Sequence, residues 1–285
     1  MTTATQPDLV RATSPDGTRI AVFVSGRGRP LVLVPGTTSD HTTWRLVAPL
    51  LADHVAVHAV DRRGRGLSGD AGAYSLPAEH DDVAAVVDAA AAAWGGPVDL
   101  LGHSYGGNVA FGAALRTGNV RRLLLYEGWP VPDVAHRRYP PELLARLDTL
   151  LAAGRPEAML ELFCREIAMM TPAEVAAIKA APTWSARVAA APTVPREVWA
   201  FGEHAFDPAD AARIRVPVLL LVGGESPAEI AADPEVVAAA LPDARIRVLP
   251  GQAHVAHLTA PEVLAAEVLA FLADQVSRRD FPSSG

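Results

Sequence analysis

Cysteine is almost absent from this chain of 285 residues, where it occurs once, as Cys164. One thiol excludes an intramolecular disulfide and any metal site built from several cysteines. The sequence around Cys164 contains no base signature. We therefore expect this residue to be a buried or half-buried helix residue and not a nucleophile.

Positive charge is also scarce. Lysine and arginine number 25 against 32 acidic residues, which gives a formal net charge of −7 and a pI near 5.7. A surface for nucleic acid or for anionic membranes would require clustered basic residues. The composition therefore favours a small-molecule partner, with no nucleic acid and no membrane. Lys179 is the single lysine and alanine is abundant, a bias typical of GC-rich genomes, so we expect a bacterial source.

Long apolar runs are missing as well. No uninterrupted run reaches the ~18 apolar residues that a membrane-spanning helix needs. Residues 1–8 contain neither the basic region nor the apolar region of a secretory signal. Hydrophobic residues still make up 50% of the chain, which is enough for the core of one large domain. The sequence predicts a globular protein that is soluble and cytoplasmic.

Strand and helix patterns alternate through the first half of the chain. Alternating runs on both sides of residues 15–17 predict an antiparallel hairpin. After the hairpin, apolar strand patterns cover residues 31–34, 55–60, 98–101 and 121–126, and helical patterns cover residues 44–51 and 80–94. This rhythm is typical of a parallel, doubly wound α/β sheet.

Residues 128–204 break this rhythm. Strand patterns vanish there, and helical patterns follow one another over residues 141–153, 157–170, 172–180 and 195–204. Strand patterns return at residues 216–222 and 244–249, with helical patterns at 234–241 and 261–276. We therefore predict a core of residues 1–127 and 205–276, an inserted helical lid of residues 128–204, and a C-terminal tail of residues 277–285.

A serine stands in the sequence Gly102-His-Ser-Tyr-Gly106, between a strand pattern and a helical pattern. A serine hydroxyl is a weak nucleophile, so chemistry at Ser104 requires a tight turn that exposes it, a base, and donors for an oxyanion. The flanking glycines permit such a turn, because a Cβ at either position would collide with neighbouring backbone. His103 is expected to point away from the serine, as a packing or hydrogen-bonding residue.

The order of hairpin, serine turn, helical insertion and late histidine loop resembles the α/β-hydrolase superfamily over essentially the whole chain. The resemblance implies the α/β-hydrolase fold, with a mostly parallel, doubly wound sheet and an inserted helical lid. It also implies that Ser104 is the catalytic nucleophile. The general base it implies is His254, in the loop after the last strand, and His257 is the rival for that role.

The resemblance further implies that the oxyanion hole consists of backbone N–H groups of Thr37 and Tyr105. Family members usually have His-Gly where this chain has Pro35-Gly36. The backbone donor survives that change, whereas the usual side-chain hydrogen bonds of the loop do not. A hydroxyl of Thr37 or Thr38 offers a further donor.

The acid of the triad is where this sequence departs from most relatives. The usual position follows the strand after the lid and aligns with Ser226, which cannot stabilise an imidazolium. Some families of this fold place the acid at the end of the strand before the lid, and here that strand ends in Glu127. We assign Glu127 as the third catalytic residue, with Glu225 and Asp133 as alternatives.

The loop Asp61–Gly69 contains several arginines. Anion binding is one interpretation of this loop, and a structural loop held by Arg–Asp hydrogen bonds is the interpretation we favour.

Together these features predict a serine hydrolase that needs no metal and no cofactor. Ester, lactone or thioester cleavage is the expected activity, and C–C bond hydrolysis uses the same residues. The lid predicts an apolar pocket for a small to medium acyl compound, with Trp129, Met169, Met170 and Trp184 as candidate lining residues. Two alternatives stay open: a non-hydrolytic enzyme such as a cyclase, lyase or perhydrolase, and a non-catalytic binding protein of the same fold.

Overall fold

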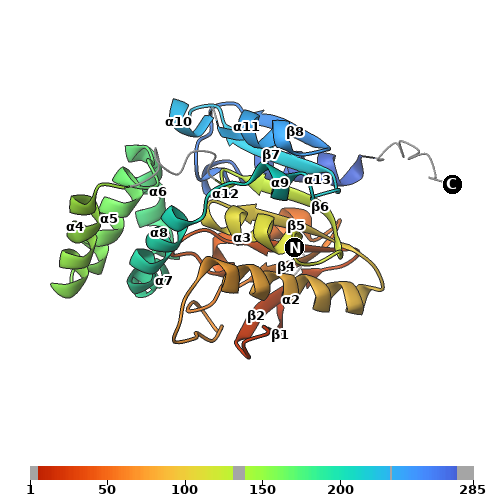
Figure 1. The fold of residues 1–285 in the computed structure, drawn as a ribbon, viewed down its shortest axis with the longest axis horizontal. Coiled ribbons are helices and arrows are strands. Elements are labelled where there is room, and N and C mark those ends of the chain that lie inside the picture. The colour runs from red at the N-terminus through yellow and green to blue at the C-terminus, as the bar shows by residue number, and fades with distance from the viewer. Residues whose placement is uncertain (1–5, 131–138, 232, 275–285) are drawn as a thin grey trace.

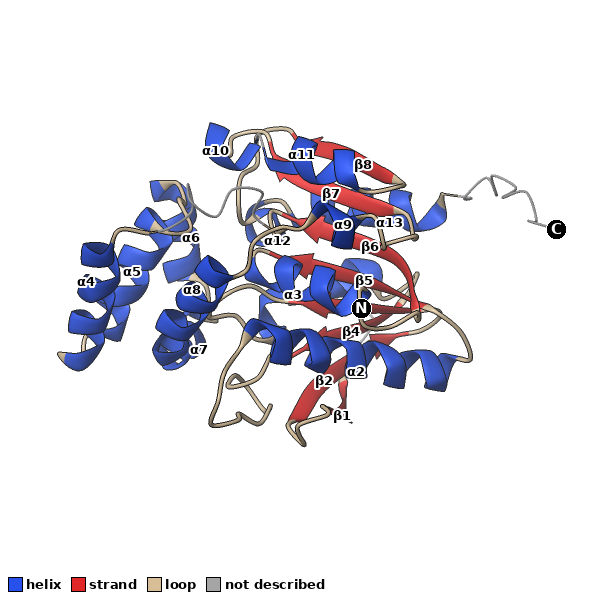
Figure 2. Cartoon of the chain, viewed as in Figure 1, coloured by secondary structure: helices blue, strands red, loops and turns tan. Residues whose placement is uncertain are grey.

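An eight-stranded sheet runs through the centre of the molecule, with helices on both of its faces (Figures 1 and 2). The computed structural model describes residues 6–130, 139–231 and 233–274. The strands are β1 (Asp8–Thr13), β2 (Arg19–Gly26), β3 (Pro30–Val34), β4 (Ala56–Val60), β5 (Val98–His103), β6 (Val120–Tyr126), β7 (Val218–Gly223) and β8 (Ala244–Leu249). They are arranged in the order β1-β2-β4-β3-β5-β6-β7-β8.

The sheet is mostly parallel, as the sequence predicts. β1 pairs antiparallel with β2, and β2 pairs antiparallel with β4, which confirms the predicted hairpin. All pairings from β4 through β3 to β8 are parallel. The carboxyl ends of β3, β5, β6, β7 and β8 therefore meet at one edge of the sheet, where open α/β sheets bind their ligands.

Helices of two groups surround this sheet. Those packed on the sheet or next to it are η1 (His41–Trp44), α1 (Ala48–Leu51), α2 (Leu76–Trp94), α3 (Tyr105–Ala114), α9 (Pro208–Ala211), α10 (Ala228–Ala231), α11 (Asp233–Ala240), α12 (Ala256–Thr259) and α13 (Pro261–Ala273). The inserted ones are α4 (Pro141–Ala152), α5 (Pro156–Glu166), α6 (Pro172–Ala180), α7 (Trp184–Ala190), η2 (Ala191–Thr193) and α8 (Val194–Glu203).

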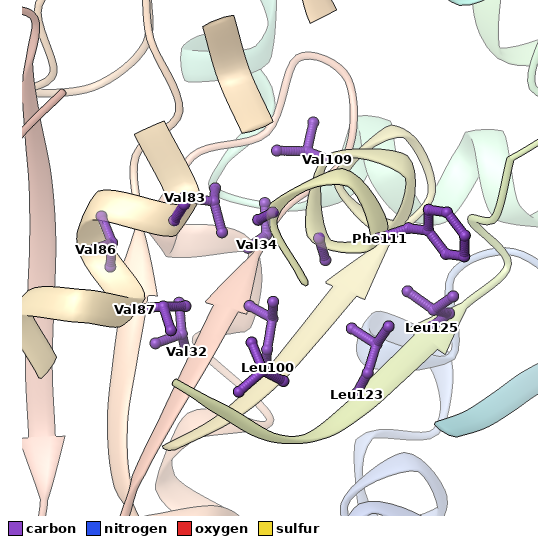
Figure 3. Packing of buried hydrophobic residues seen from close by; sticks show 14 of the residues in the cluster. Val32, Val34, Val83, Val86, Val87, Leu100, Val109, Phe111, Leu123 and Leu125 are labelled. Atoms are coloured by element: carbon purple, nitrogen blue, oxygen red, sulfur yellow. The ribbon is translucent and has the colours of Figure 1, made fainter. Parts of the chain in front are cut away.

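One face of the sheet packs under α2 and α3 (Figure 3). Across this face, Val32 and Val34 of β3 are followed by Leu100 of β5 and then by Leu123 and Leu125 of β6. These are alternate residues of their strands, because successive side chains of a strand point to opposite faces. Together they form a continuous apolar face. Helix α3, which follows β5 in the chain, packs against this face.

On the opposite face of the sheet lie the side chains of the intervening strand residues. Leu31 and Leu33 of β3 lie in a second cluster with Leu264, Val268 and Phe271 of α13. Because both faces are covered, the central strands are mostly apolar, as parallel strands are when helices bury both sides.

The inserted helices α4–α8 lie together beyond the strand ends, on the left in Figure 1. They have an apolar cluster of their own, which includes Leu147, Met159, Phe163, Val175 and Val194. None of the helices within the described ranges combines the length and the apolar character needed to cross a bilayer.

The helices differ from the sequence-based prediction at several places, most clearly at α2, α5 and α7. Helix α2 begins at Leu76, because Ser75 caps it by accepting a hydrogen bond from the N–H of Ala78 and a proline follows in the first turn. Helix α5 ends at Glu166, short of the predicted Met170. Helix α7 was not predicted, because it is short and lies between prolines that interrupt any longer periodic pattern.

Candidate active site

Ser104 occupies a sharp turn between β5 and α3. Its φ of 54° lies in the left-handed region, which costs free energy for a residue with a side chain. Surrounding glycines permit this turn: a Cβ at Gly102 would collide with the carbonyl oxygen of Gly106, and a Cβ at Gly36 would lie 2.9 Å from the Cβ of Ser104. The turn leaves the hydroxyl of Ser104 partly exposed in a pocket.

Hydrogen bonds join Ser104 to the other two predicted catalytic side chains. Nε2 of His254 lies 3.0 Å from Oγ of Ser104, and Nδ1 of His254 lies 3.0 Å from Oε2 of Glu127. A carboxylate can only accept, so Nδ1 carries the proton and donates it to Glu127. Nε2 is therefore free to accept the proton of the serine hydroxyl.

Glu127 follows β6 directly and is 7% exposed. Its Oε1 accepts hydrogen bonds from the N–H of Gly223, at 2.8 Å, and from the hydroxyl of Ser226. Burial alone would raise the pKa of Glu127, but the hydrogen bond and charge of His254, with the donors Ser226 and Gly223, hold that pKa below its usual value. The carboxylate is therefore ionised at neutral pH and positioned against His254.

Ser226 is a site residue that the sequence analysis missed. The structure shows its hydroxyl bonded to the carboxylate that faces His254. The available signal was its position, because the resemblance to the α/β-hydrolase superfamily implies a catalytic acid there.

The alternative acids lie elsewhere. Glu225 is exposed, and its backbone N–H donates to the carbonyl of Gln252. Asp133 lies outside the described residues. Within the part of the chain that the structure describes, Glu127 is thus the carboxylate that contacts His254.

Three anchors hold the loop that carries His254. Nε2 of His103 donates to the carbonyl of His254 at 2.8 Å. The hydroxyl of Tyr126 donates to the carbonyl of Ala253 and accepts from the N–H of Ala256. Oε1 of Glu174, on α6, accepts from the N–H of Val255 at 3.0 Å. The backbone on both sides of His254 is therefore bonded to the core and to an inserted helix.

His103 and His257 both lie behind this loop. His103 stacks against Tyr126 with ring centroids 5.0 Å apart, which agrees with its predicted packing role. His257 is buried against His103 and Trp44, at centroid distances of 4.6 and 5.8 Å, and is not among the described residues that line the pocket. His254 is therefore the histidine that faces Ser104.

The two predicted oxyanion residues, Thr37 and Tyr105, line the pocket beside Ser104. The guanidinium of Arg62 lies 4.6 Å from the ring centroid of Tyr105 and bonds the carbonyl of Pro35 at 3.4 Å. The hydroxyl of Tyr105 lies 2.8 Å from that of Tyr74. Arg62 thus supports the loop at which relatives carry histidine. The roles of Thr37 and Tyr105 as donors stay predictions.

The arginine loop is tied down by ion pairs, which agrees with its structural interpretation. Arg62 makes two hydrogen bonds of 2.7 and 2.6 Å to Glu79, and Arg63 makes two of 2.6 and 2.7 Å to Asp82. The pair of Arg63 with Asp82 is of the predicted Arg–Asp kind, whereas the partner of Arg62 is a glutamate of α2, which the sequence analysis did not predict. A further ion pair joins Arg65 to an inserted helix, where its partner is Glu197 of α8.

Asp61, His41 and Asp40 are close enough to one another to hold a metal ion. Hydrogen bonds within the protein account for the close approach of these three side chains, and a metal ion is not needed to explain it. Oδ1 of Asp61 accepts from the backbone N–H of His41 at 2.8 Å and from its Nδ1 at 2.7 Å, and Asp40 accepts from the N–H of Thr42 at 2.9 Å. These carboxylates cap the turn after β3.

The pocket at Ser104 spans about 680 Å³ between atoms, part of it open to solvent. Its polar lining consists of Thr37, Ser104, Tyr105, Asn108, Glu127, Tyr139, Asp233 and His254. Its apolar lining includes Trp129, Phe163, Ile167, Ala168, Val198, Phe201 and Ile230. Most of the lining area is apolar, in agreement with the sequence-based prediction, and polar side chains are also part of the lining.

Of the candidate lining residues, Trp129 lies in the pocket wall, and the other candidates are wrong. Among the described residues, Met169, Met170 and Trp184 do not line the pocket. Met169 packs on the main core, and Met170 and Trp184 pack on the cluster of the inserted helices. The physical reason is the early end of α5: the chain leaves the helix before Met169, which has a φ of 50°.

Comparisons with known proteins agree with this fold. The alpha/beta hydrolase family model matches residues 31–267, and the chain belongs to that family. A solved alpha/beta hydrolase of Sphaerobacter thermophilus is 35% identical, with 92% of this chain and 100% of that chain covered and a TM-score of 0.79. A solved thermophilic esterase of Thermogutta terrifontis is 25% identical, with 93% and 98% covered and a TM-score of 0.70.

A curated relative, the N-formylmaleamate deformylase of Pseudomonas putida, is 38% identical over 130 residues, which are 45% of this chain and 47% of that protein. The match thus spans about half the length of this relative. Together with the family match, these likenesses identify the chain as an enzyme of the alpha/beta hydrolase type.

Proposed function

We propose that this protein is a serine hydrolase that cleaves small to medium acyl compounds through an acyl-enzyme on Ser104. The observation that carries the proposal is the hydrogen-bonded series Ser104–His254–Glu127 in the wall of a pocket. A neutral imidazole with its Nδ1 proton held by a carboxylate is the arrangement that activates a serine hydroxyl.

In the first half of the reaction, Oγ of Ser104 attacks the substrate carbonyl while His254 takes its proton at Nε2. The N–H groups of Thr37 and Tyr105 stabilise the oxyanion that forms. Two such preorganised donors contribute several kcal/mol to transition-state stabilisation. The imidazolium then gives the proton to the leaving group, and Glu127 stabilises its positive charge throughout.

In the second half, water enters the pocket and gives a proton to His254 as its oxygen attacks the acyl carbon. The acyl-enzyme breaks, and the proton returns to Oγ of Ser104. Every step uses side chains and backbone of this chain, so neither a metal ion nor an organic cofactor takes part in the proposed reaction.

The scissile bond we propose is that of an ester, lactone or thioester, which the likeness to an esterase supports. A second candidate is an N-formyl amide, favoured by the match to a deformylase. C–C bond hydrolysis uses the same residues. We also propose that residues 128–204 act as the lid of the pocket, since Phe163, Ile167 and Val198 of the inserted helices contribute to its lining.

The test is labelling with a fluorophosphonate probe, combined with hydrolysis of p-nitrophenyl butyrate. Wild type is expected to take the label and to release p-nitrophenol with an initial burst, and Ser104→Ala is expected to do neither. Labelling without hydrolysis of any ester or formyl amide would favour a cyclase or lyase. An unlabelled wild type would favour a binding protein and overturn the proposal.

A further inference from the structure

Asn108 is an unusual residue for the helix in which it lies. The other residues of α3 are glycine, alanine, valine, phenylalanine and tyrosine, as expected for a helix buried against the sheet. Asparagine is a weak helix former and carries an amide that is costly to bury without partners. Asn108 is nevertheless only 7% exposed. The fold gives no reason for an amide at this place.

The side-chain amide of Asn108 makes no hydrogen bond to any residue of the described ranges, although it lies in the wall of the pocket. The contrast with Asn119 is informative, because Nδ2 of Asn119 donates to Asp88 at 2.8 Å and so has a structural role. Buried polar groups in proteins are almost always paired. The amide atoms of Asn108 are not among the fully buried unpaired atoms of the described residues, so they open into the pocket, where a ligand can supply the partner that the fold does not.

The position of Asn108 relative to Ser104 determines which part of a substrate the amide can reach. Ser104 is the N-cap of α3 and Asn108 follows four residues later, about one helical turn along, and both side chains line the same pocket. The separation along the helix axis is about 6 Å. The amide is therefore within reach of a substrate atom a few bonds away from the carbonyl that Ser104 attacks.

We propose that Asn108 is a specificity-determining residue, whose amide N–H donates a hydrogen bond to an oxygen that the substrate carries within a few bonds of its scissile carbonyl. The proposal rests on the proposed function of Ser104 and narrows its substrate class. The preferred acyl compounds bear a keto, ether, hydroxyl or amide oxygen at that distance, and purely hydrocarbon acyl esters are poorer substrates. A site built to bond a substrate group discriminates against the analogue that lacks it, because its own polar atom is then left unpaired.

Two pairs of isosteric esters test this. In the first pair, p-nitrophenyl methoxyacetate differs from p-nitrophenyl butyrate by one oxygen in place of a methylene in the acyl chain. In the second, 2-methoxyethyl acetate differs from butyl acetate in the same way on the alcohol side. For each enzyme, kcat/KM for the oxygen-containing ester is divided by kcat/KM for its methylene analogue. This ratio is then compared between wild type and variant, so that the different intrinsic reactivities of the two esters cancel.

Asn108→Leu is expected to lower the oxygen-to-methylene ratio of at least one pair by about 3- to 10-fold, the size of one hydrogen bond. Asn108→Asp is expected to lower the same ratio, because an ionised carboxylate cannot donate to an ether oxygen. Asn108→Ala serves as a second variant in case the larger leucine disturbs the fold, which the melting temperature monitors.

Val198→Ala is the matched control, since Val198 also lines the pocket but carries no polar group. It is expected to change both members of a pair alike. Ratios that stay at the wild-type value in all three Asn108 variants, with p-nitrophenyl butyrate still hydrolysed, would overturn the role of Asn108 alone. A wild type that hydrolyses none of the four esters and takes no fluorophosphonate label would instead overturn the proposed function.

Discussion

At the scale of single residues, Glu127 is the least conventional part of the site. It has a φ of 44°, so its backbone is held in a conformation that side chains rarely adopt. Both carboxylate oxygens are bonded, one to His254 and the other to Gly223 and Ser226. Such a fully bonded carboxylate holds the imidazole in one orientation and one tautomer.

Replacement of this carboxylate gives a direct prediction. Glu127→Gln is expected to lower kcat for p-nitrophenyl butyrate by about 10³- to 10⁴-fold, because an amide cannot stabilise the imidazolium or enforce the Nδ1 tautomer. KM is expected to change little. Steady-state kinetics measure both.

Glu225→Gln is the matched control, because it removes the neighbouring exposed carboxylate and leaves the site intact. Wild-type turnover in Glu127→Gln, or a comparable loss in Glu225→Gln, would refute the assignment of the acid.

The positions of these residues could be predicted to different extents from the sequence. Ser104, Glu127 and His254 each follow a strand, and parallel strands place their carboxyl ends at one edge. The resemblance to the α/β-hydrolase superfamily selected these three residues, and the strand pattern explains why they can meet. The bond from Ser226 to Glu127 could not be predicted, because it depends on how far the loop after β7 folds back. That distance is set by tertiary contacts such as the bond from Glu225 N–H to Gln252.

At the scale of secondary-structure elements, the inserted helices are bonded to the loops that surround Ser104. Glu174 of α6 bonds the loop of His254. Arg187 of α7 donates to the hydroxyl of Thr38 at 3.4 Å, next to the predicted oxyanion residue. Glu197 of α8 forms an ion pair with Arg62, at 3.2 Å. Helices α6, α7 and α8 therefore support the loops around Ser104.

Glu174 offers a test of that support. It caps α6 through a capping box with Thr171 and also accepts from the N–H of Val255. Glu174→Ala removes both, so we expect the free energy of unfolding to fall by about 1–3 kcal/mol and kcat to fall several-fold as the loop of His254 loses an anchor. Urea unfolding and steady-state kinetics measure the two effects.

The control for this variant is Glu166→Ala, which removes an exposed inserted-helix carboxylate whose bond to Arg146 is 3.3 Å long. A surface ion pair of this kind contributes roughly 0–1 kcal/mol, and turnover is expected to stay at the wild-type level. If Glu174→Ala lost stability but kept full kcat, a role in supporting the site would be excluded.

Periodic sequence patterns predicted the buried strands but not the side chains that line the pocket. Strands β3 and β7 were predictable, because burial on both faces makes them continuously apolar. The lining of the pocket was not, because it depends on the residue at which α5 ends. A helix that continued to Met170 would have turned different side chains toward Ser104 than the observed Ile167 and Ala168.

At the scale of the whole molecule, buried histidines make stability depend on pH. Burial lowers the pKa of His103 and His257 well below 6.5, and at His257 the positive charge of Arg187 adds to the effect. Both stay neutral in the folded protein at pH values at which the unfolded chain protonates them. Below about pH 6.5 the unfolded state therefore binds more protons, and folding stability falls as the pH falls.

We expect the free energy of unfolding to decrease by about 1.4 kcal/mol per pH unit for each of these histidines as the pH falls below 6.5. Glu127 adds a loss in the same direction at lower pH: its folded pKa lies below 4.5, so its stabilisation is complete above that value and disappears as the pH falls through the folded pKa. Urea unfolding from pH 7.5 down to pH 4 measures the slope.

His257→Gln is expected to make the slope shallower by the contribution of one histidine. His54→Gln, at an exposed position, is expected to leave it as in wild type. An unfolding free energy that stays constant between pH 7 and pH 5 would contradict the prediction.

The ion pairs of Glu197 with Arg62 and Arg65 have a consequence for how this enzyme can be recombined with its relatives. All three side chains are almost completely buried. A chimera that received its inserted helices from a relative without an acid at this place would leave Arg65 without this carboxylate, and loss of one partner from a buried pair costs about 3–5 kcal/mol. In chimeras with relatives, the inserted helices and the loop Asp61–Gly69 should therefore be exchanged together as one block.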